Sequence, residues 1–264
     1  FSEASEELIQ ASVAAELIHM ASLVHDDIID ESALRRSRPS VNSAWGNHFA
    51  VLCGDYLFAK AFGILSHGRL TGCMSYMVEA IGNMCHGEIL QADGRYRADA
   101  DTVRYYERIA QKTAIFLSCC CKSGAYISGA SRLQIQIMGE YGLNLGYAFQ
   151  IMDDVLDFCG DAGIMGKPKG EDLRQGIITL PVILLIGDTV YGEAAMNMIS
   201  VSGITDQGID DITDLLQKSG IIEKCIHTAE AHIDKAKQSL DLLPECEFTA
   251  FLHSLAEILR TRVN

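Results

Sequence analysis

Apolar residues recur along most of the chain at spacings of three and four, which is the pattern of helices with one buried face. The stretch EELIQASVAAELIHMASLVHDDIIDE has little polar surface before its last turns, so we expect a helix buried on most sides. No stretch reads as a hairpin or as a βαβ unit. The pattern predicts an all-α protein with helices over residues 6–31, 43–66, 73–93, 101–128, 131–158, 178–187, 191–200, 208–217, 219–239 and 245–262.

Polar and glycine-rich segments separate these helices. The segment CGDAGIMGKPKGEDLRQG, residues 159–176, has five glycines and a proline, which is typical of a loop. The 264 residues contain only four prolines and no linker-like stretch, and 48% of them are hydrophobic. We therefore expect one domain over residues 1–264 with a sizeable core. The chain begins with Phe1 rather than methionine, and we expect an amino-terminal segment to be missing.

Charge and cysteine usage narrow the classes of function. Lysine and arginine number 21 against 35 acidic residues, and this formal charge of −14 argues against nucleic-acid binding, which needs a basic surface. The nine cysteines contain no CxxC pair, so we expect no zinc site and instead reduced, buried thiols in a cytoplasmic protein. We find no apolar run long enough and free enough of charge to span a bilayer.

Two acidic clusters of the same form, D-D-x-x-D, end two of the apolar helices. The first is DDIID at residues 26–30 and the second is DDVLD at residues 153–157. Residues four apart share one face of a helix, so the outer aspartates of each cluster point the same way. Each like-charged pair costs about 0.2–0.5 kcal/mol on an exposed helix, and burial raises that cost. Two such clusters in apolar surroundings indicate a bound cation, and hard carboxylate oxygens favour Mg²⁺ shared with substrate phosphates.

Basic residues accompany both clusters. Arginine is suited to bidentate phosphate recognition, and a lysine inside the apolar run AQKTAIF needs an anionic partner. We assign phosphate contact to Arg35, Arg36, Lys112 and Lys167, and the solvated surface to Arg38 and Lys169. His19 lies two turns before Asp26 on the same face, which favours a role at this site over that of a core histidine.

With these motifs in place, the chain resembles the all-trans isoprenyl (polyprenyl) diphosphate synthases, long-chain type. The first aspartate-rich motif of that family is matched by DDIIDESALRRSRP and the second by FQIMDDVLDF. GDYLFA (54–59), GEILQ (87–91), KTA (112–114) and GKPKGEDLRQGIITLP (166–181) also match in order, so the resemblance covers about residues 10 to 185. It implies an isoprenoid-synthase-type helical bundle around a deep central cavity.

The resemblance also implies a reaction, the head-to-tail condensation of isopentenyl diphosphate with an allylic diphosphate such as farnesyl diphosphate. About three Mg²⁺ ions and basic side chains would draw off the allylic diphosphate, and no protein nucleophile is required. The matching motifs assign Mg²⁺ to Asp26, Asp30 and Asp153, assisted by Asp27, Asp154 and Asp157. They assign the allylic diphosphate to Arg35, Lys112 and Lys167, the reacting carbons to Thr113 and Gln150, and isopentenyl diphosphate to His19 and Arg36.

In the resembled family, the residues just before the first motif form the floor beneath the growing chain. These are Ala21 and Ser22 here, with Leu17 and Ile18 one turn earlier. A small floor lets a cavity extend along the helix, which rises about 30 Å over 20 residues, so we expect a long-chain product. The resemblance implies about seven or eight isoprene units. An aromatic residue at position 21 should shorten it, and Phe58 or Phe62 could plug the cavity from another helix.

One family feature has no counterpart here. The family's Gly-Gly-Lys-x-x-Arg-Pro segment supplies a lysine and an arginine for isopentenyl diphosphate, and nothing in residues 1–18 matches it. This leaves open a non-catalytic subunit of a heteromeric synthase. A class I terpene cyclase is the other alternative, although its second metal site normally has an Asn/Asp–Ser/Thr–Glu pattern. As partners we expect a second copy, with a heterodimer as the alternative, and peripheral membrane contact during product release.

Overall fold

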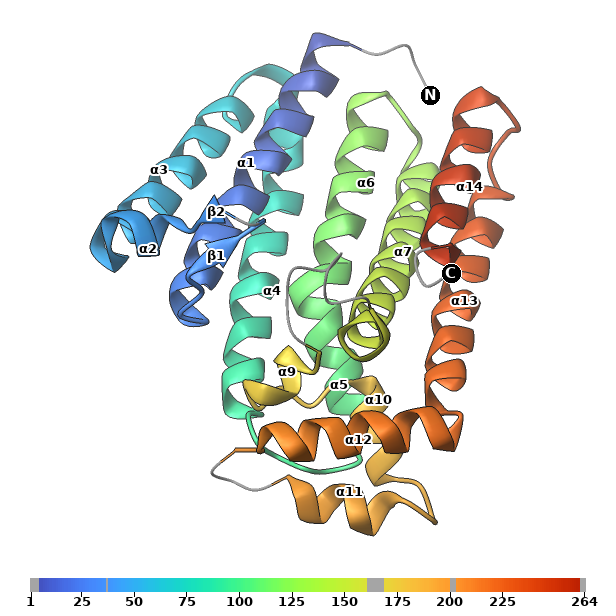
Figure 1. Ribbon diagram of the computed structural model, residues 1–264. Helices are drawn as coiled ribbons and strands as arrows, with labels where there is room; N and C mark the ends of the chain where they lie inside the picture. Colours follow the sequence, from blue (N-terminus) through green and yellow to red (C-terminus); the bar gives the residue numbers. More distant parts are fainter. Residues whose placement is uncertain (1–4, 37, 161–168, 200–202, 262–264) are drawn as a thin grey trace.

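The computed structural model describes residues 5–36, 38–160, 169–199 and 203–261, and nearly all of its regular structure is helical, which confirms the all-α class. The α-helices are α1 (Glu6–Ile29), α2 (Val41–Trp45), α3 (Asn47–Leu65), α4 (Met74–Asp93), α5 (Thr102–Ile109), α6 (Ile115–Ile127), α7 (Arg132–Cys159), α9 (Glu171–Arg174), α10 (Leu180–Ile186), α11 (Gly192–Met198), α12 (Asp206–Ser219), α13 (Ile221–Leu240) and α14 (Glu247–Arg260). A 3₁₀ helix, η1 (Gly68–Cys73), and a π-helical turn, η2 (Ala110–Ala114), complete them. The long helices run side by side as a bundle, and α11 and α12 lie across one end (Figure 1).

The observed helices follow the predicted ones with local breaks. The helix expected over residues 43–66 is divided into α2 and α3 at Gly46, whose φ of 85° lies in the left-handed region. The helix expected over 101–128 is interrupted by η2. A small antiparallel hairpin joins β1 (Leu34–Arg35) to β2 (Arg38–Pro39), so the expectation of no hairpin is wrong. Strands of two residues are too short to show an alternating pattern.

Two helices correct the expectation about membrane spans. By length and composition alone, α1 and α3 are apolar enough to cross a bilayer. In the structure they pack along each other within the bundle. Only 28% of the apolar window of α1 and 22% of that of α3 is buried, so the expectation that the helix over residues 6–31 is buried on most sides is wrong.

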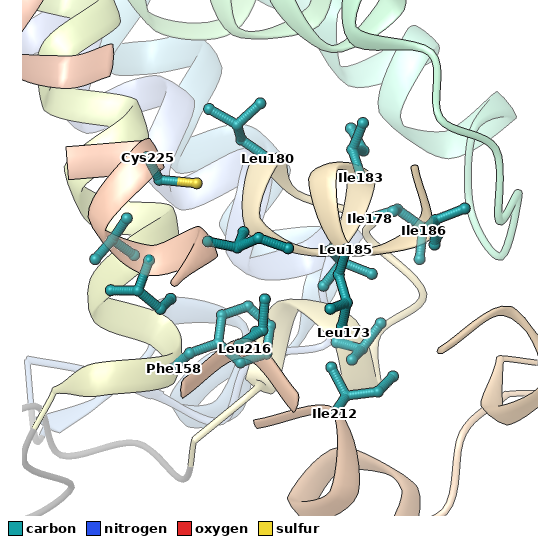
Figure 2. Packing of buried hydrophobic residues seen from close by; sticks show 14 of the residues in the cluster. Phe158, Leu173, Ile178, Leu180, Ile183, Leu185, Ile186, Ile212, Leu216 and Cys225 are labelled. Carbon is teal, nitrogen blue, oxygen red and sulfur yellow. The ribbon is translucent and has the colours of Figure 1, made fainter. Parts of the chain in front are cut away.

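Helix α7 carries the second acidic cluster, and its packing explains why that cluster is held firmly. Helices α6 and α13 pack along α7. In its last turns, Ile151, Val155 and Phe158 are buried in an apolar cluster that is completed by α10, α12 and α13 (Figure 2). Helix α10 begins with Pro181 in its first turn, where no backbone donor is lost, and nearly all of its side chains are buried. The aspartates of the same turns of α7 are thereby anchored by a rigid apolar base.

The π-helical turn η2 is in close contact with two glycines. A Cβ atom added to Gly87 of α4 would lie 2.8 Å from the backbone nitrogen of Lys112. A Cβ added to Gly146 of α7 would lie 2.5 Å from the Cα of Ala114. Both distances are shorter than van der Waals contact, and the atoms that would collide belong to the backbone. Glycine at these two positions therefore allows α4 and α7 to approach η2 closely.

We expect Gly146→Ala to lower the free energy of unfolding by about 1–3 kcal/mol, the usual cost of overpacking a tight interior. The matched control is Gly82→Ala on α4, because a Cβ at Gly82 meets nothing within 4 Å. Alanine there should be neutral or stabilise by up to about 1 kcal/mol through helix propensity. Urea unfolding of both variants measures the difference, and equal stability of the two would contradict the close approach at Gly146.

Candidate active site

The first acidic cluster lies at the carboxyl-terminal end of α1, and its three aspartates have different surroundings. Asp27 is buried, and both of its carboxylate oxygens accept hydrogen bonds from Nε of Arg35 at 2.9 Å. A second guanidinium nitrogen of Arg35 lies 2.8 Å from the same carboxylate. This ion pair fixes the hairpin that follows α1 and holds Arg35 beside the cluster. Asp30 pairs with Arg95 at 3.3 Å.

Asp26 lies in the least compensated environment of the first cluster. Burial raises the pKa of its carboxyl group to about 7, with a further contribution from the negative charge of Glu88 and an opposing one from Lys112. Glu88 of α4 in turn pairs with Lys112, with Nζ and Oε1 2.6 Å apart. Nζ of Lys112 also donates to the side-chain oxygen of Gln91 at 3.3 Å. The ionised form of Asp26 would therefore be stabilised by a cation bound beside it.

Lys112 and Thr113 are consecutive residues, yet both face the same cavity. Successive side chains on an ordinary α-helix diverge by about 100°. Both residues lie in the π-helical turn η2, where the backbone is wound more widely than in an α-helix. The hydroxyl of Thr113 donates to the side-chain oxygen of Gln150 on α7 at 2.8 Å. π-helical turns are frequent at functional sites, and here the turn carries two of the candidate residues.

The second acidic cluster lies near the end of α7. Asp154 is 2% exposed, and it accepts hydrogen bonds from the Tyr105 hydroxyl at 2.7 Å and from the Gln150 amide at 3.1 Å. Asp157 accepts the backbone N–H groups of Glu171 and Asp172 at 3.1 and 3.3 Å, so it holds the start of α9. Asp153 is half-buried. Burial, followed by the charge of Asp172, raises the pKa of Asp154 and of Asp157 to about 7.

These residues surround two adjoining hollows. The larger one, here called the apolar cavity, has a volume of about 760 Å³ and is lined mainly by α1, α4, α7 and α14 together with the start of α6. The smaller one, here called the polar pocket, has a volume of about 120 Å³. Side chains from both acidic clusters line the polar pocket, Asp30 from the first and Asp154 from the second, and Arg35 lines it as well. Lys112 and Gln150 line both hollows, so the two meet at these residues.

Of the six predicted metal-binding aspartates, Asp26, Asp30 and Asp154 line these hollows, and Asp27, Asp153 and Asp157 line neither. His19, Ser22, Asp26 and Thr113 line the apolar cavity, and the ring of His19 stacks on Phe116 with centroids 5.9 Å apart. Burial lowers the pKa of His19 below its ordinary value. Arg36 is exposed on the hairpin turn with a φ of 50°, and it lines neither hollow. Lys167 lies outside the described residues.

The proposed floor residues divide into two groups. Ser22 lines the apolar cavity, whereas Ala21 and Ile18 are completely buried in packed helix contacts and Leu17 is half-buried. Of the two aromatic residues suggested as plugs, Phe58 lines the cavity and packs at a tilt against His25, with ring centroids 5.8 Å apart. Phe62 does not line it. Leu255, Ile258 and Leu259 of α14 form part of the wall, and the sequence pattern did not indicate them.

Several functional candidates were missed from the sequence. Glu88 and Gln91 lie in GEILQ three residues apart, which places both on one face of α4, and that spacing could have indicated a shared partner such as Lys112. Tyr105 lies within a run of ordinary helix residues, and only the fold brings it to Asp154.

The raised acid pKa values make the stability of the metal-free protein depend on pH. Asp154 binds its proton more tightly in the folded state, at a pKa of about 7, than in the unfolded state, at its ordinary value of 3.8. Stability from this group is therefore fully present below pH 4 and is lost as pH rises towards 7. We expect thermal unfolding in a chelator to show a smaller decrease between pH 5 and 8 for Asp154→Asn than for the wild type. Identical pH dependence of both proteins would contradict a proton held on Asp154.

The class of protein follows from the arrangement of the two hollows. An acid-lined polar pocket that opens onto a long apolar cavity suits a substrate with a diphosphate head and a hydrocarbon tail, as bound by an enzyme of isoprenoid chemistry. Comparisons with known proteins agree with this class. Residues 1–200 match the family model for Polyprenyl synthetase, and the chain belongs to that family of prenyltransferases.

Individual relatives give the same picture. The chain is 36% identical to the "Heptaprenyl diphosphate synthase component 2" of Geobacillus stearothermophilus, over 95% of this chain and 78% of the relative. It is 38% identical to the "Decaprenyl-diphosphate synthase" of Dictyostelium discoideum, over 94% of this chain and 53% of that one. A solved polyprenyl synthase from Caulobacter crescentus, complexed with calcium and isoprenyl diphosphate, superposes with a TM-score of 0.92 at 31% identity, over 100% of this chain and 80% of that one. The names of matched relatives range from geranylgeranyl to decaprenyl diphosphate synthase.

Proposed function

We propose that this chain condenses isopentenyl diphosphate with an allylic diphosphate and releases a long-chain all-trans polyprenyl diphosphate. The observation that carries the proposal is the meeting of the polar pocket and the apolar cavity at Lys112 and Gln150. A prenyl diphosphate that lies across this junction has its charged head among the acidic clusters and its tail among apolar side chains. The carbon that reacts lies between the two.

The carboxylates fit Mg²⁺ bound together with a substrate. The raised pKa of Asp26 reflects buried negative charge that the neighbouring basic groups do not fully compensate. Within the described residues, no three acidic, histidine or cysteine side chains converge on one point as a complete metal site would require. Mg²⁺ usually takes only one or two carboxylates and completes its shell with water and substrate phosphates, so this arrangement suits it. Asp26, Asp30 and Asp153 would hold about three ions, and those ions would stabilise the charge of the departing diphosphate.

The residues of the chain itself contribute position and electrostatics. Arg35 is held beside the polar pocket by Asp27, and Lys112 is held by Glu88, so both cations are in place before a diphosphate arrives. The oxygens of Thr113 and Gln150 lie at the junction, where positive charge develops on the allylic carbon. His19 lines the cavity on the side of α1 and would face isopentenyl diphosphate. The apolar walls exclude water, which would otherwise capture the reactive carbon.

We also propose that two copies associate through the outer face of α3. Its exposed apolar side chains include Phe49, Leu52 and Tyr56, and the ring of Trp45 of α2 packs at a tilt against Phe49 with ring centroids 5.8 Å apart. Such a contiguous apolar patch is typical of an interface. The relative named as component 2 makes a heteromer the alternative. Light scattering of the purified chain should give twice the mass of the chain, and a monomer would contradict the homodimer.

A cytoplasmic location with transient membrane contact during product release completes the proposal. It is supported by nine free cysteines and by the apolar nature of the product. Cell fractionation should find the protein mainly in the soluble fraction, and recovery only with integral membrane proteins would contradict it.

The central experiment incubates the purified chain with farnesyl diphosphate and isopentenyl diphosphate, with Mg²⁺ or with a chelator, and sizes the products. We expect Mg²⁺-dependent extension to long-chain products. Consumption of farnesyl diphosphate without isopentenyl diphosphate would indicate a terpene cyclase instead. Turnover that appears only on adding a second protein would indicate a subunit of a heteromeric synthase.

A further inference from the structure

We propose that Tyr105 is a positioning residue for the transfer reaction, acting through Asp154 and Gln150 on the hydroxyl of Thr113. The inference rests on the proposed function. It concerns a tyrosine that lines neither the apolar cavity nor the polar pocket among the described residues, yet is hydrogen-bonded to the second acidic cluster.

Tyr105 is fixed tightly in the fold. Its side chain is 2% exposed, and it lies on α5, which leads directly into the π-helical turn with Lys112 and Thr113. The guanidinium carbon of Arg108 lies 5.6 Å from the centre of its ring, and Arg108 is itself held by the carbonyl of Ile178 at 2.9 Å. The hydroxyl of Tyr105 therefore reaches Asp154 from a rigid base.

A continuous series of hydrogen bonds leads from this hydroxyl to the junction. The Tyr105 hydroxyl donates to Oδ2 of Asp154 at 2.7 Å, and Oδ1 of Asp154 accepts from Nε2 of Gln150 at 3.1 Å. Oε1 of Gln150 then accepts from the hydroxyl of Thr113 at 2.8 Å. In its ionised form Asp154 only accepts hydrogen bonds, and it then determines which end of the Gln150 amide points towards it. The oxygen end must then face Thr113, whose own lone pairs remain available to a neighbour.

This orientation matters because Thr113 and Gln150 line the apolar cavity where it meets the polar pocket. Oxygen dipoles stabilise a developing positive charge best when they are already held in the right orientation before the reaction begins. Without the Tyr105 hydroxyl, Asp154 loses one of its two buried partners, and the Gln150 amide is freer to rotate. Of the carboxylates and basic residues on which substrate binding depends, only Asp154 is hydrogen-bonded to Tyr105, so we expect KM to change less than kcat.

The test uses Tyr105→Phe, which removes only the hydroxyl, and compares it with Tyr106→Phe. Tyr106 is the next residue on α5, and its ring packs edge-on against Tyr105 and Tyr147 while its hydroxyl has no hydrogen-bond partner among the described residues. We expect Tyr105→Phe to lower kcat about tenfold or more, with KM for both substrates nearly unchanged. Tyr106→Phe should retain wild-type kcat.

A double-mutant cycle with Thr113→Val separates positioning from general destabilisation. If Tyr105 acts through the hydrogen-bond series, adding Tyr105→Phe to Thr113→Val should cost little further activity. Multiplicative losses, or equal losses in both tyrosine variants, would overturn the inference. Wild-type kcat in Tyr105→Phe would also overturn it while leaving the proposed function intact.

The same experiments separate failure of the proposed function from failure of this inference, and a second cycle covers the case in which the tyrosine variant does not fold. Absence of Mg²⁺-dependent condensation by the wild-type chain would overturn the proposed function, and this inference with it. If Tyr105→Phe does not fold, the cycle between Asp154→Asn and Thr113→Val tests the same series, because the series predicts that their effects are coupled. Independent effects of those two variants would overturn the inference.

Discussion

Asp26→Asn should reduce kcat for condensation by about 10²–10³-fold or more, the usual loss when a group that stabilises transition-state charge is removed. Asparagine preserves the shape of the side chain and removes the negative charge that would hold Mg²⁺ against the diphosphate. The structure also predicts an opposite effect on stability. Burial and the charge of Glu88 raise the pKa of Asp26 to about 7, so the ionised carboxylate is unfavourable in the folded metal-free protein. The variant should therefore be at least as resistant to heat as the wild type at pH 8 in a chelator.

The combination of lost activity and retained stability is the informative result. Steady-state assays with saturating Mg²⁺ measure the first, and thermal unfolding measures the second. Asp214→Asn is the matched control, because its side chain is 67% exposed and pairs only loosely with Lys218 on the same helix. That control should keep wild-type activity. A catalytically normal Asp26→Asn enzyme would remove the first acidic cluster from the mechanism.

Ser22→Phe should shorten the product from a long chain to a short one while condensation continues. Ser22 lines the apolar cavity one turn before Asp26, so an aromatic ring there would occupy space that the growing chain needs. The acidic clusters and Lys112 would remain in place, and the early additions of isoprene units should therefore proceed. Chromatography of radiolabelled products measures the chain length for the variant and the wild type under the same conditions.

The neighbouring residue provides a contrasting variant. Ala21 is completely buried against other helices rather than facing the cavity, so Ala21→Phe should overpack the interior and cost about 1–3 kcal/mol of stability. The sequence alone predicts that Ala21→Phe shortens the product, and the structure assigns that effect to Ser22. Long products from Ser22→Phe, or short products from a stable Ala21→Phe protein, would show that the chain grows along a different wall.

The periodic pattern was sufficient for the long helices, because a buried face repeats over many turns and each repeat adds to the signal. It could not predict η2 or the hairpin, whose formation depends on contacts with other elements. Gly87 and Gly146 permit the close approach at η2, and they come from two other helices. In the same way, Asp27 and Arg35 are eight residues apart in the chain, and only the turn between them makes the ion pair.

The candidate site shows the same division. The recurrence of D-D-x-x-D indicated both acidic clusters, since a charged motif inside an apolar helix is visible without knowing the fold. The ion pair of Glu88 with Lys112 and the hydrogen bond of Tyr105 to Asp154 join separate helices, and nothing in the spacing of those residues specifies the distance between them. Sequence therefore indicated the groups that carry charge, while the fold was needed to find the groups that orient them.

Among the described residues, Lys112 and Gln150 are the two that line both hollows, and this has a consequence for how such an enzyme can diversify. The bond-breaking step belongs to the polar pocket, and the limit on product length belongs to the apolar cavity. The two hollows share Lys112 and Gln150. Mutations deep in the apolar cavity can change the length of the product without disturbing the step that breaks the carbon–oxygen bond. One ancestral catalyst could in this way give rise to synthases for a whole series of lipids, each differing from the next by a few side chains far from the reacting atoms.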